Sequence, residues 1–147
     1  MWLERLNFIL LFLPYSFMST TKAVIKTLKP GKFCVIDGEP CKVLSVTTSA
    51  PGKHGGAKAR LEAVGIFDNR RRSIVKPAAT EIEVPIVEKK VGQVVAIMGD
   101  NAQIMDLTSY ETFESKIPEE LKGRIKQGGE VIYWILMGRK MLVQTKG

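Results

Sequence analysis

The residue best placed to do chemistry in this sequence is Lys53, which lies in a glycine-rich segment. Pro51 fixes its own φ and biases the residue before it toward an extended conformation. Gly52, Gly55 and Gly56 permit positive φ and offer no side chain that would obstruct a close approach. These residue types predict a loop that presents the lysine amine outward, to a partner.

Strands are expected on both sides of this loop. The residues before it are rich in β-branched side chains, at Val43, Val46, Thr47 and Thr48. From residue 58 to residue 67, apolar and polar side chains alternate, which is typical of a half-buried strand. Lys53 is therefore predicted to lie at the tip of a β-hairpin.

A lysine that follows a glycine also invites comparison with a phosphate-binding loop. That motif requires Gly-x-x-x-x-Gly-Lys followed by Ser or Thr at the start of a helix. Here Thr47 occupies the position of the first glycine, His54 follows the lysine, and a strand comes next. A nucleotide site is disfavoured, which leaves a modified lysine or an unmodified basic hairpin that touches RNA.

The sequence contains no evident catalytic constellation. His54 is the single histidine, and a catalytic arrangement built on it would lie at the loop tip without a rigid surround. Asp100 and Asp106 could be interpreted as a carboxylate pair, but Asp100 follows a glycine in an expected turn, where aspartate is common. We therefore do not expect an enzyme.

The two cysteines, Cys34 and Cys41, flank a turn predicted at Asp37-Gly38-Glu39-Pro40 and could face each other across a hairpin. They form either a pair of small buried residues or a disulfide, which requires an oxidising setting or the cytosol of a hyperthermophile. With one histidine and two cysteines in the chain, a structural zinc site is not expected.

The formal net charge of +7 is unevenly distributed along the chain. Residues 18–88 contain 12 Lys and Arg against 7 acidic residues, whereas residues 89–147 contain 9 against 7. The basic excess therefore lies mainly in the half that carries Lys53. Positive charge attracts phosphate without specifying a sequence.

Residues 1–17 differ from the rest of the chain. Residues 6–17 are almost wholly apolar, but they are too short to span a bilayer and are interrupted by Pro14. Their flanks do not match a signal peptide, because Glu4 offsets Arg5 and no small-residue cleavage site follows. We interpret this segment as disordered or as the product of a start codon assigned too far upstream.

The remainder predicts short strands broken by turns. In the first half they are expected at residues 23–27, 33–36, 41–48, 58–66, 73–76 and 80–86. In the second half they are expected at residues 93–98, 102–107, 111–115, 131–137 and 140–145. The first set suggests a small closed barrel, with a boundary at residues 86–90.

A short helix is expected between the third and fourth strands of the second half. Pro118 suits its first turn, and Ile117, Leu121 and Ile125 would share one face. Five strands with one helix after the third form the plan of an OB fold. Because OB folds often stack bases on aromatic rings, candidates are Tyr110, Phe113, Tyr133 and Trp134, with core packing as the alternative for each.

The string from Pro51 to Lys58 closely resembles the modification loop of the hypusine-containing translation factor five-A in its archaeal form, the counterpart of bacterial elongation factor P. The resemblance extends over residues 18–147 and includes Gly99-Asp100 and the segment from Gln103 to Leu107. It implies an all-β chain, with an SH3-like barrel at residues 18–87, a modification loop at 49–57, and an OB-fold barrel at 88–147.

The resemblance also implies a function. Lys53 would receive an aminobutyl group from spermidine, through deoxyhypusine synthase, and become hypusine or deoxyhypusine. The factor would be cytoplasmic, would bind the ribosome and its large-subunit RNA, and would stabilise peptidyl tRNA to promote slow peptide bonds and termination. The alternative is a generic OB-type RNA-binding module with an unmodified Lys53.

Two further sets of residues complete the expected site. The loop residues around the lysine are Pro51, Gly52, His54, Gly55 and Gly56. The candidate RNA contacts are Lys42, Lys58 and Arg60, because Lys58 and Arg60 share the polar face of the strand that leaves the loop.

Overall fold

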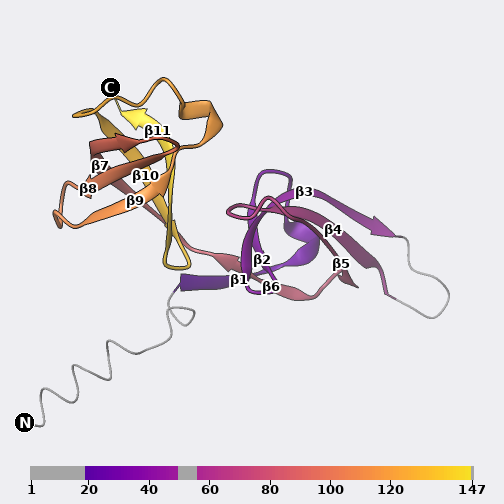
Figure 1. Cartoon of the computed structure of the whole chain (residues 1–147). Coiled ribbons are helices and arrows are strands. Elements are labelled where there is room, and N and C mark those ends of the chain that lie inside the picture. The colour runs from indigo at the N-terminus through magenta and orange to yellow at the C-terminus, as the bar shows by residue number, and fades with distance from the viewer. Residues whose placement is uncertain (1–18, 50–55, 147) are drawn as a thin grey trace, which may run out of the picture. The chain divides into compact units, whose positions relative to one another are not determined.

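The computed structural model describes residues 19–49 and 56–146. Their strands form two compact units that divide between Ile86 and Val87 (Figure 1). Within the described residues, the helical elements are two 3₁₀ turns, so the chain is all-β.

The described residues of the first unit form six strands and one 3₁₀ turn. They are β1 (Thr20–Val24), η1 (Ile25–Thr27), β2 (Phe33–Ile36), β3 (Glu39–Ser49), β4 (Lys58–Gly65), β5 (Arg71–Pro77) and β6 (Glu81–Pro85). Strands β2 to β5 form an antiparallel meander, and β1 pairs with β6 in a separate ribbon. Strand β6 lies against β2, so the ribbon and the meander enclose one core, as in an SH3-like barrel.

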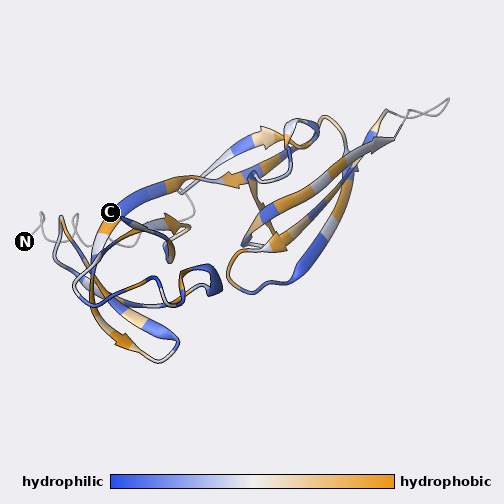
Figure 2. Ribbon diagram, turned by 90° about the horizontal axis from the view of Figure 1, so that it is seen from above, coloured by the Kyte–Doolittle hydropathy of each residue, from blue (hydrophilic) through white to orange (hydrophobic). Residues whose placement is uncertain are grey.

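Alternation along β4 builds this core. Ala59, Leu61 and Ala63 are fully buried, whereas Arg60 and Glu62 between them are not. Hydrophobic and hydrophilic segments accordingly alternate along the ribbon (Figure 2). A strand with one buried face shows this period because successive side chains point to opposite sides of the sheet. The core is completed by residues of the turns and other strands, among them Ile25, Leu28, Cys34, Ile36, Cys41 and Val43.

The turn between β2 and β3 is set by Asp37 and Gly38. Both have positive φ, at 53° and 76°, and Ile36 pairs with Glu39 on either side of them. Two central residues in the left-handed region match the twist of a two-residue hairpin, and Asp-Gly is a favoured sequence for it. This turn fixes the register of β2 against β3.

The second unit contains five strands and one 3₁₀ turn. They are β7 (Val87–Met98), β8 (Asn101–Asp106), β9 (Thr112–Lys116), η2 (Glu119–Leu121), β10 (Glu130–Leu136) and β11 (Arg139–Lys146). The sheet order is β11-β10-β7-β8-β9, and β9 lies against β11. The sheet therefore closes into a five-stranded OB-fold barrel.

The helix expected after the third strand is a single 3₁₀ turn at Glu119–Leu121. Its apolar residues are nevertheless buried as expected, with Ile117, Leu121 and Ile125 all in the barrel core. Gly123 has a φ of 81°, which ends the helical conformation earlier than the Gly128-Gly129 pair does. The apolar spacing thus predicted burial correctly but not the length of the helix.

Two predicted strands differ from the structure by three or more residues at an end. The first strand ends at Val24, and residues 25–27 form η1, because Thr27 Oγ1 donates a hydrogen bond to Val24 O at 2.6 Å and closes a turn there. In addition, residues 88–90 belong to β7 and pair with β10. Their polar side chains suggested a linker, but backbone pairing extends the strand back to Val87.

Candidate modification hairpin and its basic face

The hairpin predicted around the glycine-rich loop is present in the structure. Strand β3 ends at Ser49, which pairs with Lys58 at the start of β4. Ser49 Oγ donates a hydrogen bond to Lys58 O at 3.3 Å, and Ala78 N donates one to Ala57 O at 2.8 Å. Strands β3 and β5 thus hold the base of the loop on either side of β4.

The tip of this hairpin is outside the described residues. Lys53 lies there together with Pro51, Gly52, His54 and Gly55. Gly56 is described and exposed, and a Cβ added to it would have no heavy atom within 4 Å. The structure therefore fixes the two ends between which Lys53 must lie.

Strand register places the three candidate RNA contacts on one face of the β3-β4-β5 sheet. Lys58 and Arg60 project from the outer face of β4, and Lys42 pairs with Val64 of that same face. Six residues separate Lys58 from Val64, which corresponds to roughly 20 Å along a strand. Lys42 therefore shares the face but lies at the end remote from the loop.

Arg60 forms an ion pair with Glu62, with 3.4 Å between Nη2 and Oε1. The two side chains are 60% and 42% exposed, so solvent screens the attraction. Arg60 consequently remains available to an anionic partner, which needs only to displace a weak surface contact.

Sequence reasoning missed a further cation on this face, Arg71. It is exposed and pairs with Val64 from the β5 side, so it projects with Arg60 and Lys58. The run Arg70-Arg71-Arg72 indicated a cluster of positive charge, but only the register of β4 against β5 shows that Arg71 faces outward.

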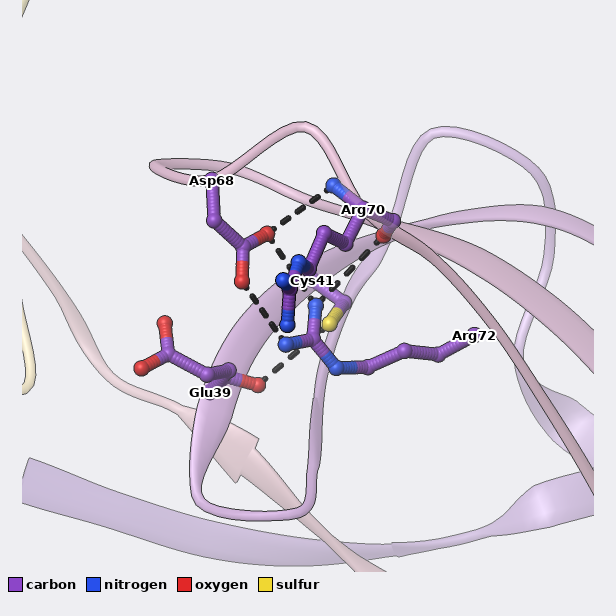
Figure 3. Close-up of polar contacts among 5 residues, drawn as sticks. All are labelled: Glu39, Cys41, Asp68, Arg70 and Arg72. Atoms are coloured by element: carbon purple, nitrogen blue, oxygen red, sulfur yellow. Dashed lines mark hydrogen bonds and ion pairs between the residues drawn. The ribbon is translucent and has the colours of Figure 1, made fainter.

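Arg72 lies on the side of β5 opposite to Arg71, where it forms an ion pair with Asp68 (Figure 3). The two groups form a bidentate pair, with Nη2–Oδ2 at 2.7 Å and Nη1–Oδ1 at 3.1 Å. Hydrogen bonds from Arg72 and from Arg70 N hold the pKa of Asp68 far below its usual range. This pair ties the β4–β5 turn to the first residues of β5.

Cys34 and Cys41 pair directly across the β2–β3 hairpin, as the sequence suggested. Both are free thiols and fully buried, and Cys41 lies beside the Arg72 guanidinium (Figure 3). Burial raises the pKa of Cys34 to about 12, and it also raises that of Cys41. In this structure they are therefore small core residues.

The four aromatic residues considered as candidates for base stacking differ in burial. Tyr133 is 2% exposed and packs against Phe113 with ring centroids 4.7 Å apart, so both serve the OB-barrel core. Trp134 is half-buried, with Lys89 Nζ 5.8 Å from its ring centroid. Tyr110 is 70% exposed and is the one candidate whose ring is open to a partner.

Asp100 and Asp106 do not form a carboxylate pair. Asp100 lies in the β7–β8 turn and forms an ion pair with Lys122 at 3.4 Å. Asp106 is buried, and its carboxylate accepts hydrogen bonds from the Tyr133 hydroxyl and from Thr108 N and Ser109 N. Asp106 therefore organises a loop of the second unit.

Residues 19–49 and 56–146 contain no group of three or more acidic, cysteine or histidine side chains arranged to hold a metal ion. No helix in the same part of the chain is long and apolar enough to cross a membrane.

The fold and the hairpin define a class: two-unit β proteins in which an SH3-like barrel, with a glycine-rich lysine-containing segment of the sequence between its strands β3 and β4, precedes an OB-fold barrel. Residues 19–80 match the family model described as translation initiation factor 5A-like, N-terminal. Residues 86–146 match the model described as eukaryotic elongation factor 5A hypusine, DNA-binding OB fold. The chain belongs to the translation initiation factor 5A family.

Several named relatives support this assignment. The chain is 56% identical to translation initiation factor 5A of Methanosphaera stadtmanae, over 88% of this chain and 98% of the relative. It is 50% identical to that of Pyrococcus furiosus, over 86% and 95% respectively. The solved structure of the Methanococcus jannaschii factor, at 44% identity, superposes with a TM-score of 0.80 over 87% of this chain and 96% of that chain.

Proposed function

We propose that this protein is a cytoplasmic, ribosome-binding translation factor whose Lys53 carries a spermidine-derived aminobutyl group. It would be the substrate of a modifying enzyme, deoxyhypusine synthase, rather than a catalyst. The observation that carries the proposal is the β3–β4 hairpin, which holds a glycine-rich lysine loop beside a basic sheet face.

The chemistry of the modified side chain is suited to tRNA. An added butylamine lengthens the arm and converts one amine into two, so that a single side chain neutralises more phosphate. Pro51 restricts the loop's conformations and thereby lowers the ordering entropy that docking of the loop costs. Near the peptidyl-transferase centre, the arm would hold the acceptor end of peptidyl tRNA.

The gain in the rate of peptide-bond formation would come from positioning of the peptidyl tRNA. Orientation of reacting groups lowers a barrier by several kcal/mol when the ground state is otherwise mobile. Slow peptide bonds and peptide release would benefit most, since their substrates are poorly placed without help. The basic residues Lys42, Lys58 and Arg60 would contact ribosomal or transfer RNA phosphate and anchor the first unit.

Peptide mass spectrometry of the protein from its native cell tests the modification. We expect one added aminobutyl-derived group on the peptide that contains Lys53 and none on Lys58, which lies in β4 beyond the loop. Protein expressed in a bacterial host without the modifying enzyme should carry plain lysine at both positions.

A native peptide that contains only unmodified Lys53 would contradict the proposal. That result would favour the generic OB-type RNA-binding module instead. Replacement of Lys53 by arginine provides the matched control, because it keeps the charge but offers no primary amine to modify.

A further inference from the structure

The outer face of the β3-β4-β5 sheet contains a depression of about 110 Å³ beside Leu44. Its lining comprises four residues of the outer face, Leu44, Glu62, Arg71 and Ser73, together with Ala63 and Arg72, which alternate with them along β4 and β5. Pockets that enclose a whole small molecule usually measure about 300–1,000 Å³. This depression can therefore take the edge of one ring, with the rest of the ligand lying across the sheet.

A β-bulge in β3 exposes the apolar wall of the depression. Val43 pairs with Ala63 and Ser45 pairs with Glu62, so Leu44 is the extra residue between them. Leu44 is 38% exposed, whereas Val43 is buried in the core. Bulges commonly re-aim a side chain, and here the bulge turns a leucine toward solvent on the face that also carries Arg60 and Arg71.

The charged groups around the depression differ in their remaining capacity to form ion pairs and hydrogen bonds with a ligand. Arg72 is paired with the Asp68 carboxylate, whereas no carboxylate of the described residues lies within ion-pair distance of Arg71. Glu62 is contacted by Arg60 and, at 3.5 Å, by Ser45 Oγ. A carboxylate has about four lone-pair sites, so Glu62 retains acceptor capacity toward a further donor.

Arg71 and Arg60 flank the depression along the strands. Arg71 pairs with Val64 of β4, four residues from Arg60, which places the two backbones roughly 13 Å apart along the strand direction. A chain of phosphates could therefore contact both arginines while the chemical group between them enters the depression. The ligand this arrangement fits has regularly spaced negative charges and a flat, partly apolar group with hydrogen-bond donors.

We propose that the depression beside Leu44 is a subsite for one unpaired base of single-stranded RNA, with an adjoining phosphate on Arg71. The base would lie against Leu44 and direct an exocyclic amino group toward Glu62, as carboxylates accept from cytosine N4. Single-stranded RNA is read in this way because its bases can be splayed out of a stack. The choice of RNA rests on the proposed function, whereas the location and base preference rest on this geometry.

The test is the binding of the full-length protein to labelled single-stranded cytidine and uridine oligonucleotides of equal length, across a range of salt concentrations. The unaltered protein should prefer the cytidine oligomer by about three- to tenfold, the contribution of one exposed hydrogen bond. Glu62→Gln should reduce this ratio toward one, whatever its effect on overall affinity, because it removes the charge that strengthens the bond.

Two further variants separate charge from apolar contact. Arg71→Ala should weaken both oligomers equally and reduce the slope of log affinity against log salt by about 0.7. Leu44→Ala should weaken both without changing the slope. Arg124→Ala, an exposed arginine in the second unit, is the matched control and should leave binding unchanged.

The outcomes distinguish this subsite from the proposed function. If Lys58→Ala and Arg60→Ala weaken binding while Arg71→Ala, Leu44→Ala and Glu62→Gln behave like the control, the subsite is wrong and the basic face still stands. If none of these five variants changes the affinity, this face does not bind RNA. The subsite is then wrong, and the proposed function loses the support that it draws from the basic face. Melting temperatures of all variants should match, since the changes lie on the outer face.

Discussion

Asp106 illustrates how a single carboxylate can look catalytic in a sequence and be structural in the fold. Its side chain is 5% exposed, and the Tyr133 hydroxyl donates to it from the neighbouring core. Ser109 N and Thr108 N donate to its other oxygen at 2.8 Å each, which shapes the loop that follows β8. These donors, the Tyr133 hydroxyl foremost, hold its pKa at about 2.

This depressed pKa predicts a pH dependence of stability. An aspartate has a pKa of about 3.9 in an unfolded chain. The stabilisation from charged Asp106 is therefore fully present above about pH 4 and disappears as the pH falls toward 2. Tyr133→Phe should lower the free energy of unfolding by about 1–3 kcal/mol at pH 7, and by less near pH 2.

Urea unfolding at a series of pH values measures this effect. Tyr110→Phe is the matched control, because Tyr110 is 70% exposed and its hydroxyl is not part of the network. An equal loss at pH 7 and pH 2 for Tyr133→Phe would show that packing, and not the hydrogen bond to the charged carboxylate, is responsible.

At the scale of elements, Gly92 sets how closely two strands of the second barrel approach. A Cβ at this position would lie 2.5 Å from Ile104 Cγ2 and 3.1 Å from the backbone oxygen of Met105. Backbone cannot move aside as the end of a flexible side chain can. Gly92→Ala should therefore lower the free energy of unfolding by about 1–3 kcal/mol, the usual range for overpacking.

Gly56→Ala is the matched control in the first unit, since a Cβ there meets no heavy atom within 4 Å. Its effect on stability should stay within about 0.5 kcal/mol, as for most surface changes. Thermal and urea unfolding of the two variants check both values. Similar losses in both variants would mean that the crowding at Gly92 does not set the cost.

The sheet face that carries Lys58 and Arg60 predicts a salt effect on ribosome binding. A cation that binds phosphate releases counterions, so removal of one such cation should reduce the slope of log affinity against log salt by roughly 0.7–0.9. Lys58→Ala and Arg60→Ala should weaken binding and flatten this slope. Arg124→Ala and Lys126→Ala remove exposed cations of the second unit and should do much less.

Titration of ribosome binding at several salt concentrations decides this prediction. If all four variants change the affinity and its salt dependence by the same small amount, the ribosome-binding surface lies elsewhere. Only the Lys53 arm would then remain as a candidate contact in the first unit.

At the scale of the whole chain, the N-terminal family match begins at residue 19. We expect residues 1–17 to be dispensable, with Met18 as the functional start. A chain that begins at Met18 should melt at the same temperature as the full chain and accept the proposed modification on Lys53 to the same extent. Loss of folding on truncation, or association of the full chain with membranes, would contradict this.

The sequence alone was sufficient for much of the architecture because its signals are local. Alternation from residue 58 onward predicted β4, the Asp37-Gly38 pair predicted a hairpin turn, and the spacing of Ile117, Leu121 and Ile125 predicted a buried segment. Each of these depends on residues a few positions apart, whose φ preferences and side-chain directions follow from residue type.

Tertiary structure decided what depends on pairing between distant residues. The register of β3, β4 and β5 determines that Arg71 faces outward while Arg72 turns to Asp68, although the two are adjacent in the chain. The bulge that exposes Leu44 likewise exists only when β3 is paired with β4. A shift of one residue in register exchanges the two faces of a strand, so no local pattern could have distinguished these arginines.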